Sequence, residues 1–148
     1  MGWSLAQQQR LQAERKILSK FFPHFKWISP NDNSNTKVEG NVPTNLGNSY
    51  TLRIYVPSDF PNSRPDMVVT SPHPLRGFLG QDLIHYGATS KMHTLKPRDG
   101  FVKICHYKDW QPNLTLYLVI LKGRIWLEAL EAHKKSGKYI ANFLREMQ

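Results

Sequence analysis

The stretch GFVKICHYKDWQPNLTL, residues 100–116, carries the strongest indications of fold and chemistry in this chain of 148 residues. It passes from a short apolar run into a turn-rich segment and then into the longest helical pattern of the sequence. Cys105, the only cysteine, stands where the apolar run ends. A single thiol at such a junction has two interpretations: it is a nucleophile, or it is a small buried side chain that fills the core.

The residues after this stretch predict two helices. Thr115 or Asn113 can cap the first of them, and Ser136-Gly137 ends it. A second helix is predicted over 139–147. The apolar positions of the first helix fall at helical spacing and form a stripe wide enough to face a core: Leu116, Val119, Ile120, Gly123, Trp126, Leu127 and Leu130.

The residues before this stretch predict a helix and then a sheet. Apolar residues from Leu5 to Phe22 recur as in an amphipathic helix, which Pro23 ends. Strand-like runs follow at 24–29, 36–42, 50–56 and 67–70. Residues 71–99 lack periodicity and are predicted to form a long loop with one short helical turn, before a short extended run at 101–105. We therefore expect one α+β domain over 1–148, with a four-stranded antiparallel meander covered by helices.

Composition narrows the function classes. One cysteine excludes an intramolecular disulfide, and the longest apolar run is too short to span a bilayer, so we expect a cytoplasmic protein without a membrane partner. The net charge is +9, but the basic residues are scattered and no base-reading motif accompanies them, so nucleic acid is not the expected main partner. Five cations lie within 14 residues of Cys105 in sequence and favour a thiolate there, unless they form a solvated basic face: Lys91, Lys96, Arg98, Lys103 and Lys108.

Two segments, taken in order, resemble ubiquitin-conjugating enzymes. Residues 50–65 look like that family's third strand and its Tyr-Pro-x-x-x-Pro segment, through Tyr50–Val56, Phe60-Pro61 and Pro65. Residues 100–116 resemble the active-site cysteine followed by the Trp-x-Pro entry to the second helix. The resemblance implies the ubiquitin-conjugating fold and thioester chemistry at Cys105.

Departures from the eukaryotic pattern look like the prokaryotic branch of this family. His93-Thr94-Leu95 stands where eukaryotic members carry His-Pro-Asn, so a leucine replaces the asparagine, and Trp126–Glu128 with Ser136-Gly137 is similar to the prokaryotic second helix. Members of that branch accompany CBASS, the cyclic-oligonucleotide antiphage defence systems. The resemblance implies a bacterial transferase that carries the C-terminus of a partner protein, such as the nucleotidyltransferase of the defence operon, from an activating enzyme to an amine.

Acyl transfer assigns roles to residues near the thiol. Cys105 accepts the acyl group, and His93 or His106 is the base; His93 is preferred because adjacent residues of an extended strand point to opposite sides. Asn113, Tyr107 or backbone amides replace the missing asparagine as oxyanion donor, and Asp109 orients or deprotonates the amine.

No cofactor or metal is expected, because the His and Cys spacing is not that of a zinc site. The candidate site residues are therefore Cys105, His93, His106, Asn113 and Asp109. The alternative function is a non-catalytic ubiquitin-conjugating-like module that binds a ubiquitin-like or other partner protein.

Overall fold

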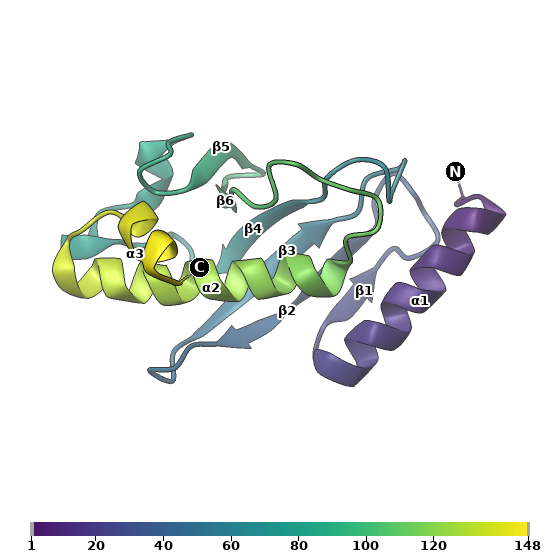
Figure 1. The fold of residues 1–148 in the computed structure, drawn as a ribbon, viewed down its shortest axis with the longest axis horizontal. Coiled ribbons are helices and arrows are strands. Elements are labelled where there is room, and N and C mark those ends of the chain that lie inside the picture. The colour runs from purple at the N-terminus through teal and green to yellow at the C-terminus, as the bar shows by residue number, and fades with distance from the viewer. Residues whose placement is uncertain (1, 148) are drawn as a thin grey trace.

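A computed structural model describes the backbone of residues 2–147 and the side chains of residues 2–145 (Figure 1). The helices are α1 (Leu5–Phe21), α2 (Leu116–Ser136) and α3 (Ile140–Met147), with short 3-10 helices η1 (Phe78–Gly80) and η2 (Leu83–Tyr86). The strands are β1 (Lys26–Ile28), β2 (Lys37–Pro43), β3 (Ser49–Tyr55), β4 (Asp66–Ser71), β5 (Thr94–Arg98) and β6 (Phe101–Ile104). The α+β class and the helix positions agree with the sequence prediction.

The strands form one antiparallel sheet in the order β1-β2-β3-β4-β6-β5. The first four are the predicted meander, but the sheet has six strands, so the predicted number of four was wrong. Strand β5 was hidden in the supposed loop because Pro97 interrupts its pattern. A proline is tolerated at a sheet edge, which is where β5 lies, because no neighbouring strand needs its missing N–H.

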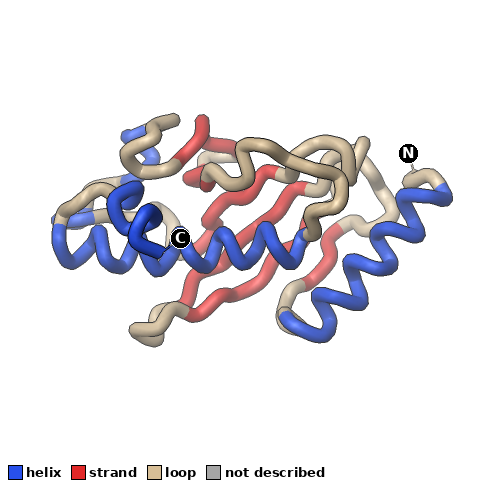
Figure 2. Tube along the Cα trace, in the orientation of Figure 1, coloured by secondary structure: helices blue, strands red, loops and turns tan. Residues whose placement is uncertain are grey.

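Helix α2 crosses one face of the sheet (Figures 1 and 2), and its buried side chains belong to the core. All seven apolar positions predicted for its inner stripe are buried. Thr115 caps its start through a hydrogen bond from the Leu118 N–H, and Gly137 ends it in the left-handed conformation with φ of 77°. A Cβ added to Gly123 would lie 2.7 Å from both Leu52 Cδ1 and Met67 Sδ, so the helix axis lies close to the sheet.

Helix α1 begins at a capping box formed by Ser4 and Gln7 and ends one residue before Phe22. Its apolar stripe is narrower than predicted. Leu11 and Leu18 are buried, whereas Leu5 is 72% exposed. The buried face also contains a carboxylate, Glu14.

The Glu14 carboxylate joins α1 to the start of α2. It accepts one hydrogen bond from Arg10 Nε and one from the Leu116 N–H, both at 2.8 Å. The Arg10 guanidinium also donates to the carbonyls of Pro112 and Leu114 at 2.6 Å. These contacts fix the segment that runs from the cysteine loop into α2.

Candidate functional site

Cys105 follows the last residue of β6 and is 9% exposed. Its N–H donates to the His93 carbonyl at 3.0 Å, and His93 has a left-handed φ of 55°. A cavity of about 340 Å³ opens at this point, walled on one side by apolar side chains of α2 and α3. The other residues that line the cavity carry reactive, polar or charged groups: His93, Cys105, His106, Tyr107, Lys108 and Lys122.

The structure brings His93 and His106 together at this cavity. Cys105 and His106 both line the cavity, and the His106 imidazole reaches the Pro65 carbonyl. Strand alternation does not apply because β6 ends at Ile104 and the chain turns at Tyr107, whose φ is 34°. Both histidines therefore stay candidates for a role at the thiol.

The His106 imidazole is buried, with 3% of the residue exposed. Its Nε2 lies 2.7 Å from the Pro65 carbonyl, which can only accept, so Nε2 carries the proton and Nδ1 is a bare acceptor. Nδ1 is buried without a hydrogen-bond partner. Burial lowers the pKa of His106 to about 4, so the ring is neutral at pH 7. The Arg64 side chain also donates a hydrogen bond to the backbone carbonyl of His106 at 3.2 Å, so His106 is held through its backbone as well as its ring.

His93 is the more accessible of the two histidines. Burial first, and then the charges of Lys108 and Lys122, lower its pKa below the ordinary 6.5. It is thus neutral at physiological pH and able to accept a proton. The Lys122 Nζ lies 5.0 Å from the centroid of the Tyr107 ring, and burial raises the pKa of Tyr107, which keeps its phenol protonated as a donor.

Two predicted site residues lie away from the cavity. Asn113 and Asp109 are exposed, and neither lines it. Their loop turns away after Tyr107 because Trp110 Nε1 donates to the Pro61 carbonyl at 2.8 Å. Trp110 therefore holds this loop against the segment between β3 and β4.

The cations around the thiol are only partly those chosen by sequence distance. Lys108 lines the cavity, but Arg98 and Lys103 pair with Asp66 at 3.0 and 3.4 Å elsewhere. Lys122 was missed because it is 17 residues from Cys105. It lies one helical turn before Trp126, which also lines the cavity. That spacing places both residues on the same face of α2 and could have identified Lys122 from the sequence.

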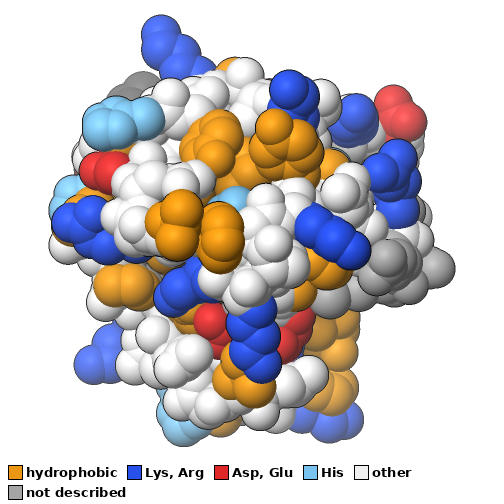
Figure 3. Space-filling view, turned by 90° about the vertical axis from the view of Figure 1, so that its left-hand side faces the viewer, with side chains coloured by type: hydrophobic (Ala, Val, Ile, Leu, Met, Phe, Trp, Pro, Cys, Tyr) orange, Lys and Arg blue, Asp and Glu red, His pale blue; other side chains and the backbone are white. Residues whose placement is uncertain are grey.

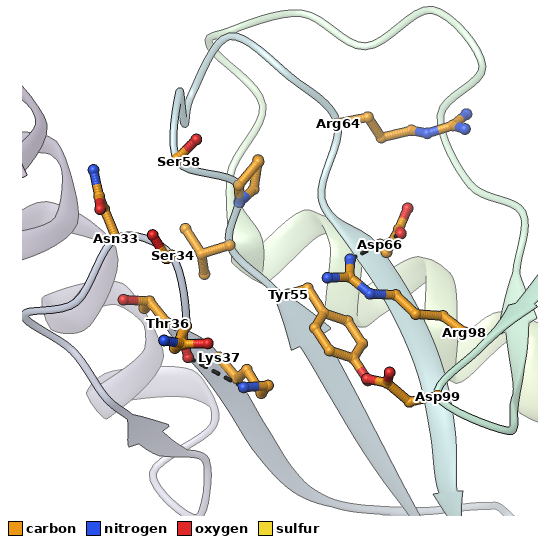
Figure 4. Close-up of a pocket in the computed structure, with 13 residues that line it drawn as sticks. Asn33, Ser34, Thr36, Lys37, Tyr55, Ser58, Arg64, Asp66, Arg98 and Asp99 are labelled. Atoms are coloured by element: carbon orange, nitrogen blue, oxygen red, sulfur yellow. Dashed lines mark hydrogen bonds and ion pairs between the residues drawn. The ribbon is translucent and has the colours of Figure 1, made fainter. Parts of the chain in front are cut away.

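A larger hollow, of about 650 Å³, lies elsewhere (Figure 4). It is polar, and its carboxylates are satisfied internally: Asp66 by Arg98, and Asp99 by the Tyr55 hydroxyl at 2.6 Å. The Arg98 guanidinium also covers the Tyr55 ring at 3.7 Å. Because it contains no cysteine or histidine, this hollow lacks the nucleophile that the chemistry predicted from the sequence requires.

Within the described part of the chain, no three His, Cys, Asp or Glu side chains gather in a way that could hold a metal ion. No helix over residues 2–147 has the length and apolar character needed to cross a membrane. A scan against protein-family models finds no match, and searches of curated proteins and of solved structures find none either.

Proposed function

We propose that this protein is a ubiquitin-conjugating-like transferase that carries the C-terminus of a partner protein as a thioester on Cys105. The observation that carries the proposal is the cavity where the only thiol meets two neutral histidines and two lysines. The order of elements adds support, because the thiol lies between an antiparallel meander and a helix entered through Trp110 and Pro112. The family's motifs have these elements in the same order.

In the first step the Cys105 thiolate attacks the acyl carbon of an activated C-terminus. A carbon–sulfur bond forms and the leaving group of the activating enzyme departs with its electron pair. Lys108 and Lys122 line the same cavity as the thiol. The oxyanion of the tetrahedral intermediate takes a hydrogen bond from the protonated Tyr107 phenol, which replaces the donor lost at Leu95.

In the second step an amine attacks the thioester and the thiolate leaves. The amine must lose a proton, and His93 is the base because its ring is neutral and only half-buried. His106 has a different role, since its Nε2 proton is committed to the Pro65 carbonyl. It holds the cysteine loop against the segment before β4.

The resemblance supplies the proposed setting. The donor is the nucleotidyltransferase of an antiphage defence operon, a separate enzyme activates it, and the reaction takes place in the cytoplasm. The alternative function is a binding module without chemistry, which the burial of the thiol favours, since Cys105 is only 9% exposed. Reactivity of the thiol distinguishes the two functions.

The test uses a synthetic peptide thioester with mercaptoethanesulfonate as leaving group, which removes the need for an activating enzyme. Transfer of the acyl group to Cys105 should give an intact-mass adduct that thiol reductant removes, and Cys105→Ala should form none. Tyr107→Phe keeps the ring but loses the donor, so its transfer rate should fall about 100-fold or more. An unreactive thiol in the folded wild-type protein would favour the binding module.

The base is tested on the preloaded thioester. Discharge to free lysine should slow further below about pH 6.5, where His93 becomes protonated, in addition to the pH dependence of lysine itself, and His93→Gln should lose that further slowing. Unchanged discharge by His93→Gln across pH 5 to 9 would exclude His93 as the base.

A further inference from the structure

A second hollow of about 350 Å³ lies beside α3, next to the cavity at Cys105. The two hollows adjoin at His93 and Leu144, which line both, and together we call them the Cys105 groove. The wall of the groove is fixed, because the Ala141 N–H donates to the Lys91 carbonyl at 2.9 Å and ties α3 to the segment before β5. The groove therefore exists before any ligand binds.

The groove is positively charged along its whole length. Lys108 and Lys122 line the part next to the thiol, and Lys91 and Arg145 line the part beside α3. Within residues 2–145, no carboxylate lines the groove and none pairs with these four cations. Three of these cations have neutral partners: Lys91 lies over the Tyr139 ring, Lys122 over the Tyr107 ring, and Arg145 donates to Asn142 Oδ1.

The groove also offers apolar contacts. Leu144 lies at its middle, Trp126 and Ile125 line the Cys105 end, and Tyr139, which is 42% exposed, lines the far end. Figure 3 views the end of the molecule that carries α3, where separate basic side chains lie among exposed hydrophobic ones and acidic side chains are sparse. An extended polypeptide with alternating acidic and apolar side chains matches such a surface.

We propose that the Cys105 groove binds the C-terminal tail of the donor protein in an extended conformation, and that this tail carries aspartate or glutamate residues. The C-terminal carbonyl lies at Cys105, and the acidic residues upstream of it lie beside Lys91 and Arg145. This inference rests on the proposed transferase function. A peptide is favoured over nucleic acid because the groove has an apolar wall and ends at a thiol.

Binding of fluorescein-labelled octapeptides to the full-length Cys105→Ala protein, followed by anisotropy, tests the inference. An acidic peptide ending in glycine is compared with a version carrying glutamine for each glutamate and with one carrying lysine. At low salt the acidic peptide should bind about tenfold more tightly than the glutamine version, and 0.5 M salt should remove the difference.

Charge reversal locates the binding site. Lys91→Glu should abolish the preference for acidic peptide, and Lys91→Gln should reduce it. Lys16→Glu makes the same charge change on the exposed face of α1 and should leave the preference unchanged. Circular dichroism checks that each variant is folded.

The inference is overturned if the glutamine peptide binds as tightly as the acidic one, if no peptide binds, or if Lys16→Glu has the effect of Lys91→Glu. Displacement of the peptide by a single-stranded oligonucleotide at lower concentration than by unlabelled peptide would overturn it in favour of nucleic acid. Because the Cys105→Ala variant lacks the thiol, the peptide-binding result is independent of the thioester assay. A preference for acidic peptide without any Cys105 adduct would refute the transferase function alone.

Discussion

Replacing His106 by glutamine should change how the stability of the protein depends on pH. The native ring is neutral, with a pKa lowered by burial to about 4, against 6.5 for an ordinary histidine. Between these values the unfolded chain binds a proton that the folded protein does not, so the folded state loses stability as the pH falls. The stabilisation is fully present above pH 6.5 and disappears as the pH approaches 4.

The size of this effect follows from the two pKa values. The full difference corresponds to about 3 kcal/mol, of which about 2 kcal/mol is lost between pH 7.5 and pH 5. His106 is 97% buried, being 3% exposed, so solvent screening does not reduce this figure. The charges of Arg64, Asp66 and Lys122 also act on the ring, and their effect on the pKa is smaller than that of burial.

Urea denaturation at pH 7.5, 6 and 5 measures the free energy of unfolding for wild type and His106→Gln. The advantage of wild type over the variant should shrink by about 2 kcal/mol over this range. His24→Gln removes an exposed histidine and serves as the matched control. Parallel pH curves for wild type and His106→Gln would show that the ring titrates normally and would refute its assignment as a neutral, buried side chain.

Three further predictions concern other residues of the site and its frame. Glu14→Ala should cost about 2–4 kcal/mol in urea denaturation, because it leaves the buried Leu116 N–H without its acceptor, whereas a cost below 0.5 kcal/mol would contradict the role of this carboxylate. Gly123→Ala should cost about 1–3 kcal/mol, since its methyl group would overlap side chains of the sheet, and an unchanged melting temperature would disprove that close contact. Lys122→Gln should raise the pKa of His93 toward 6.5 in an NMR titration, because a positive neighbour that opposes protonation is removed; an unshifted titration would place the lysine charge too far away to matter.

The sequence was most informative where side-chain periodicity reports directly on burial. The inner stripe of α2 was predicted correctly, because one helix face packs on the sheet along its full length. The strands of the meander were also found, since each is bounded by turn residues. Strand β5 was not, because Pro97 hides a short edge strand whose pairing depends on β6, a partner that periodicity cannot show.

The candidate site was only partly predictable for a related reason. The sequence showed that His93 and His106 were near the thiol but could not show that both line one cavity, because that depends on the turn at Tyr107. Choosing cations by their sequence distance from Cys105 missed Lys122, which α2 brings to the cavity. It selected instead two cations that pair with Asp66 on another part of the sheet. Charge near a nucleophile is a property of the tertiary fold.

The direct test of the central claim is to trap the acyl group in cells. Cys105→Ser would hold it as an oxyester and Cys105→Lys as an isopeptide. Each variant is co-expressed with the products of the neighbouring genes, and intact-mass analysis is followed by peptide mapping. The proposal predicts one adduct, joining position 105 to the C-terminal carboxyl of a second protein through a tail that carries acidic residues. Folded variants without any adduct, in cells where the partner proteins are present, would contradict a thioester-forming role for Cys105.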